Sequence, residues 1–288
     1  MYDYLIAPFV EFGFMRRALA GTLALALGAG PIGVFLMLRR MSLVGDAMAH
    51  AILPGAALGF MVAGLNLFAM TAGGIVAGVI VAVLTGIVAR VTELKEDASL
   101  AAFYLLSLAL GVTLVSLRGT NVDLLHVLFG TVLALDDNTL LLIGAITSVT
   151  LAALALIYRP LVLECVDPGF LRSVSRAGAP VHIAFLALVV LNLVAGFHAL
   201  GTLLAVGLMM LPAAVARFWA RDITAMIAIS VATAVLSGLI GLLVSFHAGV
   251  PSGPAIILVA GVLYLVSIFV GRVGGVLPQL FPGRHLEA

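Results

Sequence analysis

The sequence predicts an all-α membrane protein, a bundle of eight or nine transmembrane helices, and its composition leads to that prediction. Hydrophobic residues make up 64% of the 288 residues, and charged residues make up 9%. The mean hydropathy is +1.29. Because a soluble domain carries roughly 25% charged residues, this chain cannot cover a globular surface with polar groups and must have lipid as its solvent. The spans are expected to be helices, since open sheets leave backbone groups unpaired in lipid.

Nine apolar runs are long enough to cross the hydrocarbon core, which takes about 20 residues of helix. They lie near 15–38, 41–64, 67–91, 97–117, 138–159, 180–197, 200–218, 222–247 and 253–272. The sixth and seventh runs are short and are joined only by "FHALG", so eight crossings is the alternative. We expect residues 1–288 to form a single transmembrane domain.

Positive charge predicts the orientation of these spans. If the segment after the first run is cytoplasmic, three basic residues fall outside, namely Arg16, Arg17 and Arg118. The basic residues that fall inside are Arg39, Arg40, Arg90, Lys95, Arg159, Arg172, Arg176, Arg217, Arg221, Arg272 and Arg284. The net charge of +1 gives no indication of a nucleic-acid partner, and the single cysteine, Cys165, excludes an intramolecular disulfide.

An aspartate and a histidine interrupt the second apolar run, in the stretch "MSLVGDAMAHAILPG" from Met41 to Gly55. Asp46 and His50 are four residues apart, so a helix places them on one face. A charge inside a span is costly and usually faces a cavity or a partner. Carboxylate and imidazole are both metal ligands, and two interpretations stay open: a ligand pair, or a structural pair whose members satisfy each other. Pro54 removes a backbone donor and is expected to kink this span.

The remaining candidate metal ligands are weaker and lie toward the outer ends of the spans. His198 and His247 are each near such an end. Asp123 and His126 share a face of the segment 116–139, whose core is too short to cross and is expected to form an interfacial or re-entrant helix. For each of these side chains an interfacial role is the alternative.

The polar segment 159–180 is the longest cytoplasmic loop, and it reads either as a short surface helix or as a plain connector. Its apolar residues, Phe170, Leu171 and Val174, favour the helix. A faint internal symmetry relates "AHAILPGAALGF" in the second span to "AVGLMMLPAAVARF" in the seventh. These spans run in opposite directions, as an inverted repeat requires.

Several stretches together resemble the membrane permease subunits of ABC importers for zinc, manganese and iron. They are "LRRMSLVGDAMAHAILPGAALGF", "EDASLAAFYLLSLALGVTLVSL", "DLLHVLFGTVLAL", "GTLLAVGLMMLPAAVAR" and "PSGPAIILVAGVLYLVS", in the order of that family. The resemblance implies a type II importer fold in a bacterial cytoplasmic (inner) membrane and a homodimer around the translocation path. It also implies two partner proteins: a separate cytoplasmic ATPase and an extracytoplasmic metal-binding protein.

The resemblance also assigns residues. Asp46 and His50 would be the metal site in the path. The segment from Glu164 to Gly178, with Asp167 and Phe170, would be the coupling helix that contacts the ATPase. The chain would not be an enzyme and would hold no permanent cofactor, only the transported ion. The pair Arg39–Arg40 resembles zinc members, whereas many manganese permeases would have glycine at Arg40, so the expected cargo is Zn²⁺, with Mn²⁺ or Fe²⁺ as the alternative.

Two other classes of protein compete with an ABC permease. The chain has no Gly-x-x-x-x-Gly-Lys motif, so ATP hydrolysis would need the separate subunit. A secondary metal transporter without an ATPase needs an ion or proton relay, and few acidic residues lie mid-span. An intramembrane enzyme needs a constellation such as His-Glu-x-x-His, which the sequence lacks.

Overall fold

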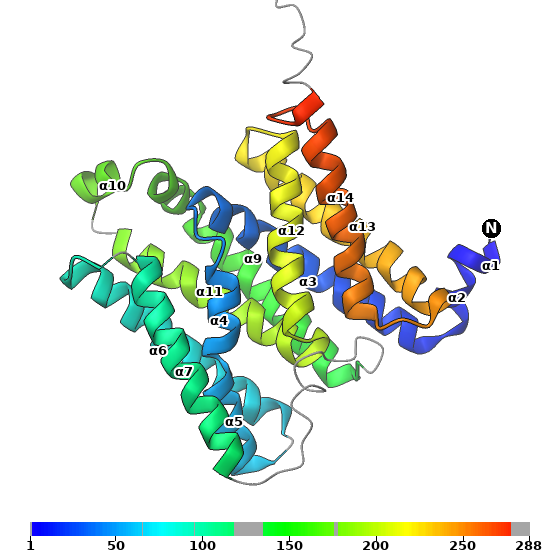
Figure 1. Ribbon diagram of the computed structural model, residues 1–288, viewed down its shortest axis with the longest axis horizontal. Coiled ribbons are helices and arrows are strands. Elements are labelled where there is room, and N and C mark those ends of the chain that lie inside the picture. The colour runs from blue at the N-terminus through cyan, green and yellow to red at the C-terminus, as the bar shows by residue number, and fades with distance from the viewer. Residues whose placement is uncertain (1, 65, 95, 118–134, 176–177, 278–288) are drawn as a thin grey trace, which may run out of the picture.

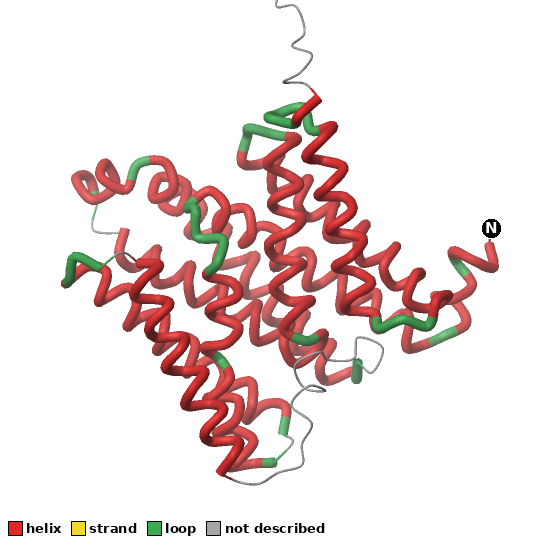
Figure 2. The backbone as a smooth tube through the Cα atoms, viewed as in Figure 1, coloured by secondary structure: helices red, strands yellow, loops and turns green. Residues whose placement is uncertain are grey.

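The computed structural model describes residues 2–64, 66–94, 96–117, 135–175 and 178–277, and almost all of these residues are helical (Figures 1 and 2). In chain order the helices are α1 (Tyr2–Leu5), α2 (Ala7–Glu11), α3 (Gly13–Leu38), α4 (Val44–Ala51), α5 (Leu53–Ala63), α6 (Leu67–Val91), α7 (Glu96–Leu117), α9 (Asp137–Val166), α10 (Pro168–Val174), α11 (Gly178–Leu200), α12 (Thr202–Trp219), α13 (Ile223–Ala248) and α14 (Ser252–Val270).

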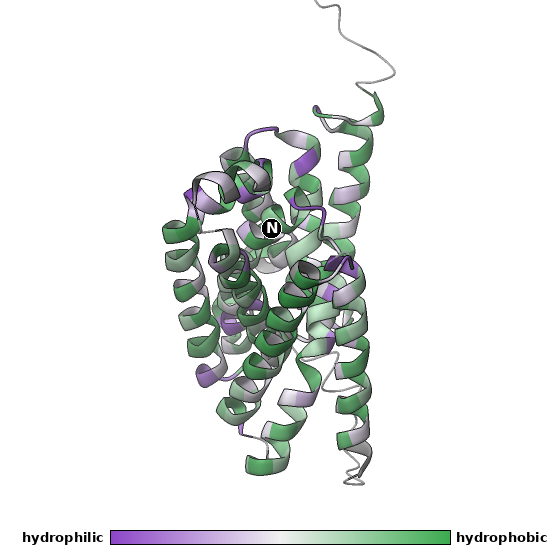
Figure 3. Cartoon of the chain, turned by 90° about the vertical axis from the view of Figure 1, so that its left-hand side faces the viewer, coloured by the Kyte–Doolittle hydropathy of each residue, from purple (hydrophilic) through white to green (hydrophobic). Residues whose placement is uncertain are grey.

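Nine helices of the described part are long and apolar enough to cross a membrane, with α4 and α5 together making one of them. Hydrophobic residues run along these helices, and hydrophilic residues gather toward their ends and connections (Figure 3). The sixth and seventh spans are separate helices because the chain turns at Gly201, whose φ is 85°. Glycine adopts such a positive φ without strain. The all-α membrane fold is confirmed, and the alternative of eight spans is not needed.

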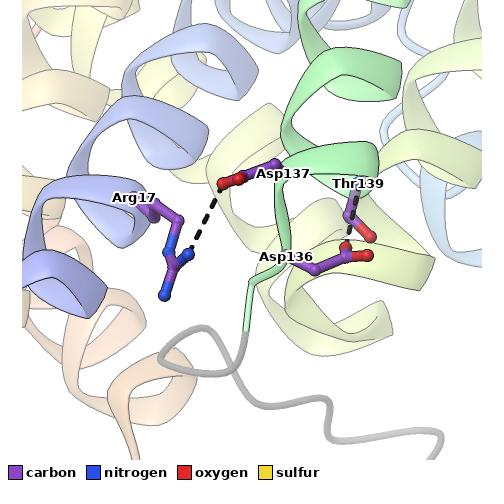
Figure 4. A network of polar contacts seen from close by, with 4 residues as sticks. All are labelled: Arg17, Asp136, Asp137 and Thr139. Carbon is purple, nitrogen blue, oxygen red and sulfur yellow. Dashed lines mark hydrogen bonds and ion pairs between the residues drawn. The ribbon is translucent and has the colours of Figure 1, made fainter.

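The helices alternate between two ends of the bundle. At one end, which we name the α10 end after the short helix it carries, the C-terminus of α3 meets the start of α11 through Arg39 and His182. At the opposite end, His247 of α13 contacts the backbone oxygen of Tyr4, and Arg17 of α3 lies 3.5 Å from Asp137 of α9 (Figure 4). The predicted orientation would place the α10 end in the cytoplasm.

The start of α9 shows why a helix begins there. The carboxylate of Asp136 accepts a hydrogen bond of 3.0 Å from the backbone N–H of Thr139, which makes Asp136 the N-cap (Figure 4). Hydrogen bonds from Thr139 hold the pKa of the Asp136 carboxyl below its usual value. The ion pair beside it joins two exposed side chains and contributes little, about 0–1 kcal/mol. The cap therefore matters more to this end of α9 than the ion pair does.

The centre of the bundle is formed by α3 and α11, each of which is 72% buried, against 22% for the peripheral helix α7. Small residues let helix backbones touch, as is usual between helices in membranes. A Cβ on Gly33 of α3 would collide with the backbone oxygen of Met209 in α12. These contacts fix the positions of the helices around the candidate site.

The fifth span is longer than the predicted 138–159. Helix α9 runs through Pro160 to Val166. Leu161 and Glu164, which follow the proline, are both buried. Packing of this last stretch therefore offsets the loss of the backbone hydrogen bond that Pro160 cannot donate. Within the segment 164–178 predicted to be the coupling helix, residues 164–166 thus belong to α9, and the coupling role itself stays a prediction.

The short surface helix itself is present as α10, and the alternative of a plain connector is wrong. Asp167 caps it, because its carboxylate accepts a hydrogen bond of 2.9 Å from the N–H of Phe170. Of the four predicted coupling residues, only these two belong to α10 and its cap, whereas Glu164 lies in α9 and Gly178 begins α11.

The predicted kink of the second span is confirmed as an interruption at Ile52, between α4 and α5. The seventh span behaves differently, because α12 continues through Pro212. The inverted repeat stays a prediction. The outer segment with Asp123 and His126 lies outside the described residues.

Candidate functional site

The site is built on α4, which is short because Pro54 follows it. Proline has no N–H to donate to the carbonyl of His50, so the helical ladder loses a hydrogen bond there. A neighbouring helix stabilises the same break, since the Ser107 hydroxyl of α7 donates a hydrogen bond of 2.9 Å to the backbone oxygen of Ala51. A Cβ on Gly111, one turn further along α7, would lie 3.1 Å from the nitrogen of Pro54. Helix α7 therefore packs directly against the α4–α5 junction.

Asp46 and His50 face each other across one turn of α4. Their closest atoms, Asp46 Oδ1 and His50 Nε2, are 3.9 Å apart. Hydrogen bonds between such atoms are about 2.7–3.2 Å long, so the two side chains do not satisfy each other. Two ligands at about 2.0–2.2 Å from one metal ion can be up to roughly 4.4 Å apart. The separation therefore fits two donors to a shared cation better than it fits a structural pair.

The exposure of the pair indicates what covers it. In the isolated chain the Asp46 side chain is 69% exposed and that of His50 is 34% exposed. Because a carboxylate within a span does not face hydrocarbon, this face of α4 requires water or another polypeptide beside it.

The imidazole of His50 is held from one side only. It stacks on Tyr104 of α7, with ring centroids 6.4 Å apart. Its Nδ1 is buried and has no hydrogen-bond partner among the described residues. The ring orientation is therefore set by the aromatic contact rather than by a hydrogen bond.

Two methionines of α12 lie on the far side of α4. The Met209 sulfur and a side-chain carbon of Met210 are each 3.9 Å from the position a Cβ would take on Gly45. Met209 is fully buried, as expected of a flexible space-filling residue. Among the described residues, no three His, Cys, Asp or Glu side chains converge as metal ligands.

The structure separates the weaker candidates from this pair. His247, at the end of α13, lies 2.9 Å from the backbone oxygen of Tyr4 and packs against the Tyr4 ring. It therefore anchors the N-terminal helix. His198 lies in the last turn of α11, and Asp123 and His126 are outside the described residues.

A second polar cluster, which sequence reasoning missed, lies at the α10 end. It joins Arg39 after α3, Glu96 of α7, Glu164 of α9 and His182 of α11. A Cβ on Gly178 would lie 2.9 Å from Glu164 Oε2, so this predicted coupling residue packs against the cluster. The only signal in the sequence was that these residues all lie near span ends on the side predicted to be cytoplasmic.

An apolar groove of about 460 Å³ lies beyond the α4–α5 junction, between α5, α6 and α7. Its lining includes Pro54, Gly73 and Leu110, and Ser107 is its one side chain with a polar atom. A groove without carboxylate or imidazole does not suit a divalent cation. This groove is therefore not a candidate metal site.

Comparison with known proteins agrees with this architecture. A model of the ABC-3 family, described as the ABC 3 transport family, matches residues 11–271. The manganese import system permease protein ScaB of Streptococcus parasanguinis is 32% identical over 260 residues, which cover 90% of this chain and 91% of the relative. The manganese transport system membrane protein MntC of Halalkalibacterium halodurans is 32% identical over 279 residues, which cover 96% and 94%.

Iron is named in a third relative, and a solved structure extends the match to three dimensions. The chelated iron transport system membrane protein YfeD of Yersinia pestis is 27% identical over 273 residues, which cover 95% of this chain and 90% of the relative. A structure described as PsaBC from Streptococcus pneumoniae in complex with Fab has a TM-score of 0.84 and 28% identity, covering 98% of this chain and 100% of that chain. The chain is a multi-span membrane protein that belongs to the ABC 3 transport family.

Proposed function

We propose that the chain is the permease subunit of an ATP-driven importer that moves Mn²⁺ across the bacterial cytoplasmic membrane. The observation that carries this proposal is the Asp46–His50 pair, 3.9 Å apart on the exposed face of α4, in a member of the ABC 3 transport family. Relatives named for manganese support the cargo.

We propose manganese rather than the zinc expected from the sequence because relatives are named for manganese. The expectation of zinc rested on Arg40, and the backbone there offers another explanation for that residue. Arg40 has a φ of 57° and follows α3 in a Schellman ending, in which the N–H of Met41 donates to the carbonyl of Leu36 and the N–H of Arg40 donates to that of Met37. Glycine is the usual residue at this position of such an ending. The choice between arginine and glycine there concerns the helix end, and it gives no information about the metal.

The metal pair would act as a transient site. Carboxylate and neutral imidazole suit manganese, iron and zinc alike, and two donors from one chain hold an ion weakly enough to release it. Because Asp46 is exposed in the isolated chain, we propose that a second copy lies beside it and that the two copies line the path with four donors. The whole chain would then be one transmembrane domain of a homodimer.

The ATPase would be a separate chain that docks on α10. Phe170 is 52% exposed on this helix, which lies outside the candidate spans and offers an apolar contact to a protein. Asp167 holds the helix start, and Glu164 with Gly178 would support it from beneath. A metal-binding protein would deliver the ion at the opposite end.

The test is to purify the chain with an ABC ATPase subunit from the same genome, reconstitute both in liposomes with a metal-binding protein, and measure ATP hydrolysis and uptake of Mn²⁺, Fe²⁺ and Zn²⁺. We expect Mn²⁺ to stimulate hydrolysis and to enter the liposomes. Preferred uptake of Fe²⁺ would favour the iron relatives, and uptake that needs no ATP would contradict the ABC mechanism.

A further inference from the structure

The buried cluster at the α10 end joins four helices through a chain of charged and polar side chains. Arg39 Nη2 lies 2.5 Å from His182 Nδ1, and His182 Nε2 lies 2.7 Å from Glu96 Oε1. On its other side, Arg39 Nη2 lies 4.0 Å from Glu164 Oε1. Arg39 also lies over the ring of Phe185, 5.6 Å from its centroid.

The chemistry of these groups fixes the hydrogen atoms on the histidine. An arginine can only donate, so His182 Nδ1 must accept from Arg39. The ring hydrogen is then on Nε2, the nitrogen that lies 2.7 Å from Glu96 Oε1. A neutral His182 thus lies between the guanidinium of Arg39 and the carboxylate of Glu96.

The contact between Arg39 and Glu164 is not closed in this conformation. Their side chains are only 10% and 7% exposed, yet Arg39 Nη1 and Glu164 Oε2 have no hydrogen-bond partner among the described residues. An incompletely paired buried charge is costly. A shift of about 1 Å would bring Arg39 Nη2 and Glu164 Oε1, which are 4.0 Å apart, within hydrogen-bond distance. A small shift of the end of α9 would therefore complete the pairing of Arg39 with Glu164.

The two ends of this chain of contacts lead to different functional elements. Glu164 lies three residues before Asp167, the cap of α10. Glu96 is in the first turn of α7, the helix that holds the metal pair through Tyr104 and Ser107. Tyr104 is eight residues beyond Glu96, about 12 Å along the helix. A continuous set of contacts thus connects α10 with His50.

We propose that Arg39 and His182 are positioning residues of the transport cycle, which relay displacement of α10 and the end of α9 through α7 to the ring of His50. The proposal rests on the proposed function, because it assumes an ATPase at α10 and an ion at Asp46 and His50. When the ATPase pulls α10, Glu164 closes onto Arg39. The shift of Arg39 then draws His182, Glu96 and the start of α7 with it.

The test compares Arg39→Gln with Arg159→Gln in the reconstituted complex. Arg159 is an exposed arginine of α9, so its variant is a matched control for loss of one arginine at the same end. A relay should couple ATP use to transport, and coupling energies between sites correspond to factors of about 5–150. We expect Arg39→Gln to lower the Mn²⁺ transported per ATP by at least about fivefold, with Arg159→Gln unchanged. Equal transport per ATP in the two variants overturns the relay.

Glu164→Gln is the second variant. Because it keeps the size of the side chain, it serves as the test if the Arg39→Gln complex does not assemble. It should show the same loss, and an assembled Glu164→Gln complex with normal transport per ATP overturns the relay. Cys165 provides a readout that does not depend on activity, since it is the only cysteine of the chain and adjoins Glu164. Its rate of alkylation, followed by mass spectrometry, should differ between the nucleotide-free and ATP-trapped complexes, and Glu164→Gln should abolish that difference.

The control that separates the two proposals is the unmodified complex. If it shows no metal-stimulated ATP hydrolysis, the proposed function fails and the relay fails with it. If the unmodified complex couples ATP hydrolysis to Mn²⁺ transport and both variants transport as much Mn²⁺ per ATP, only the relay fails.

Discussion

Gly55 of α5 and Gly73 of α6 touch through their backbones. A Cβ on Gly55 would collide with the backbone oxygen of Gly73, and a Cβ on Gly73 would collide with the backbone oxygen of Gly55. In lipid, helices pack against each other most favourably when small residues allow such close approach. The contact fixes the α5–α6 pair directly after Pro54, so it also sets where α4 ends and where His50 lies.

We therefore expect Gly55→Ala to lower the thermal stability of the purified chain, by about 1–3 kcal/mol as for other overpacked sites. Gly144→Ala in α9 is the matched control, because nothing lies within 4 Å of its Cβ position. Alanine is the better helix former by up to about 1 kcal/mol, so the control should be neutral or slightly more stable. A Gly55→Ala chain as stable as the control would contradict the close packing of α5 on α6.

The Asp46–His50 pair gives a prediction that separates metal ligands from a structural pair. His50→Ala and Asp46→Asn should abolish Mn²⁺ uptake while the chain still inserts, assembles with its ATPase and keeps its thermal stability. The reason is geometric, because at 3.9 Å the two side chains do not hold each other in place. A structural pair would instead lose about 3–5 kcal/mol when one partner is removed. Variants that are unstable yet transport at their residual abundance would reject the metal site.

Local patterns in the sequence were enough to predict the membrane fold, the nine candidate spans and the interruption at Pro54. Each of these features depends on a short stretch of chain. The length of an apolar run determines a span, and one missing backbone donor determines where a helix is interrupted. The pair Asp46 and His50 was predictable for the same reason, since one helical turn joins them.

Features that depend on tertiary packing were not predictable in this way. The cluster of Arg39, Glu96, Glu164 and His182 joins four helices that are far apart in sequence, and each residue alone is ordinary at the end of a span. The extension of α9 through Pro160 was missed because burial of its last turns, not local preference, decides where it ends. The zinc expectation took Arg40 as a marker of cargo, although its φ of 57° reflects how α3 ends, and the relatives named for manganese and iron do not support it.

Arg40→Gly tests that last conclusion. A left-handed backbone costs a residue other than glycine about 1 kcal/mol, so the variant should be as stable as the parent or slightly more stable. The order of preference among Mn²⁺, Fe²⁺ and Zn²⁺ should not change, because Arg40 is not a donor to the candidate site. A reversal of metal preference in uptake assays would restore Arg40 as a determinant of cargo.

The cap of α9 predicts a dependence on pH. Asp136→Ala should lower stability by about 1 kcal/mol at neutral pH, as for other N-caps, whereas Asp136→Ser should recover most of that loss. Because the hydrogen bonds of Thr139 lower the pKa of Asp136 in the folded chain, its contribution is complete above the unfolded value and is lost as the pH falls through the folded value. Thermal melts of parent and Asp136→Ala should converge at acid pH, and a constant difference would contradict a charged cap.

The docking of the ATPase on α10 predicts the effect of a charge at its exposed apolar residue. Phe170 is 52% exposed on a helix outside the spans, so Phe170→Asp should leave the fold of the permease intact. Burying an unpaired carboxylate against a partner is strongly unfavourable, and the variant should therefore fail to co-purify with the ATPase or lose its stimulation by Mn²⁺. Ser173→Asp is the matched control, since Ser173 is an exposed residue of the same helix whose hydroxyl bonds only its own turn. If Phe170→Asp assembles and turns over as the control does, the ATPase binds elsewhere and α10 is not the coupling helix.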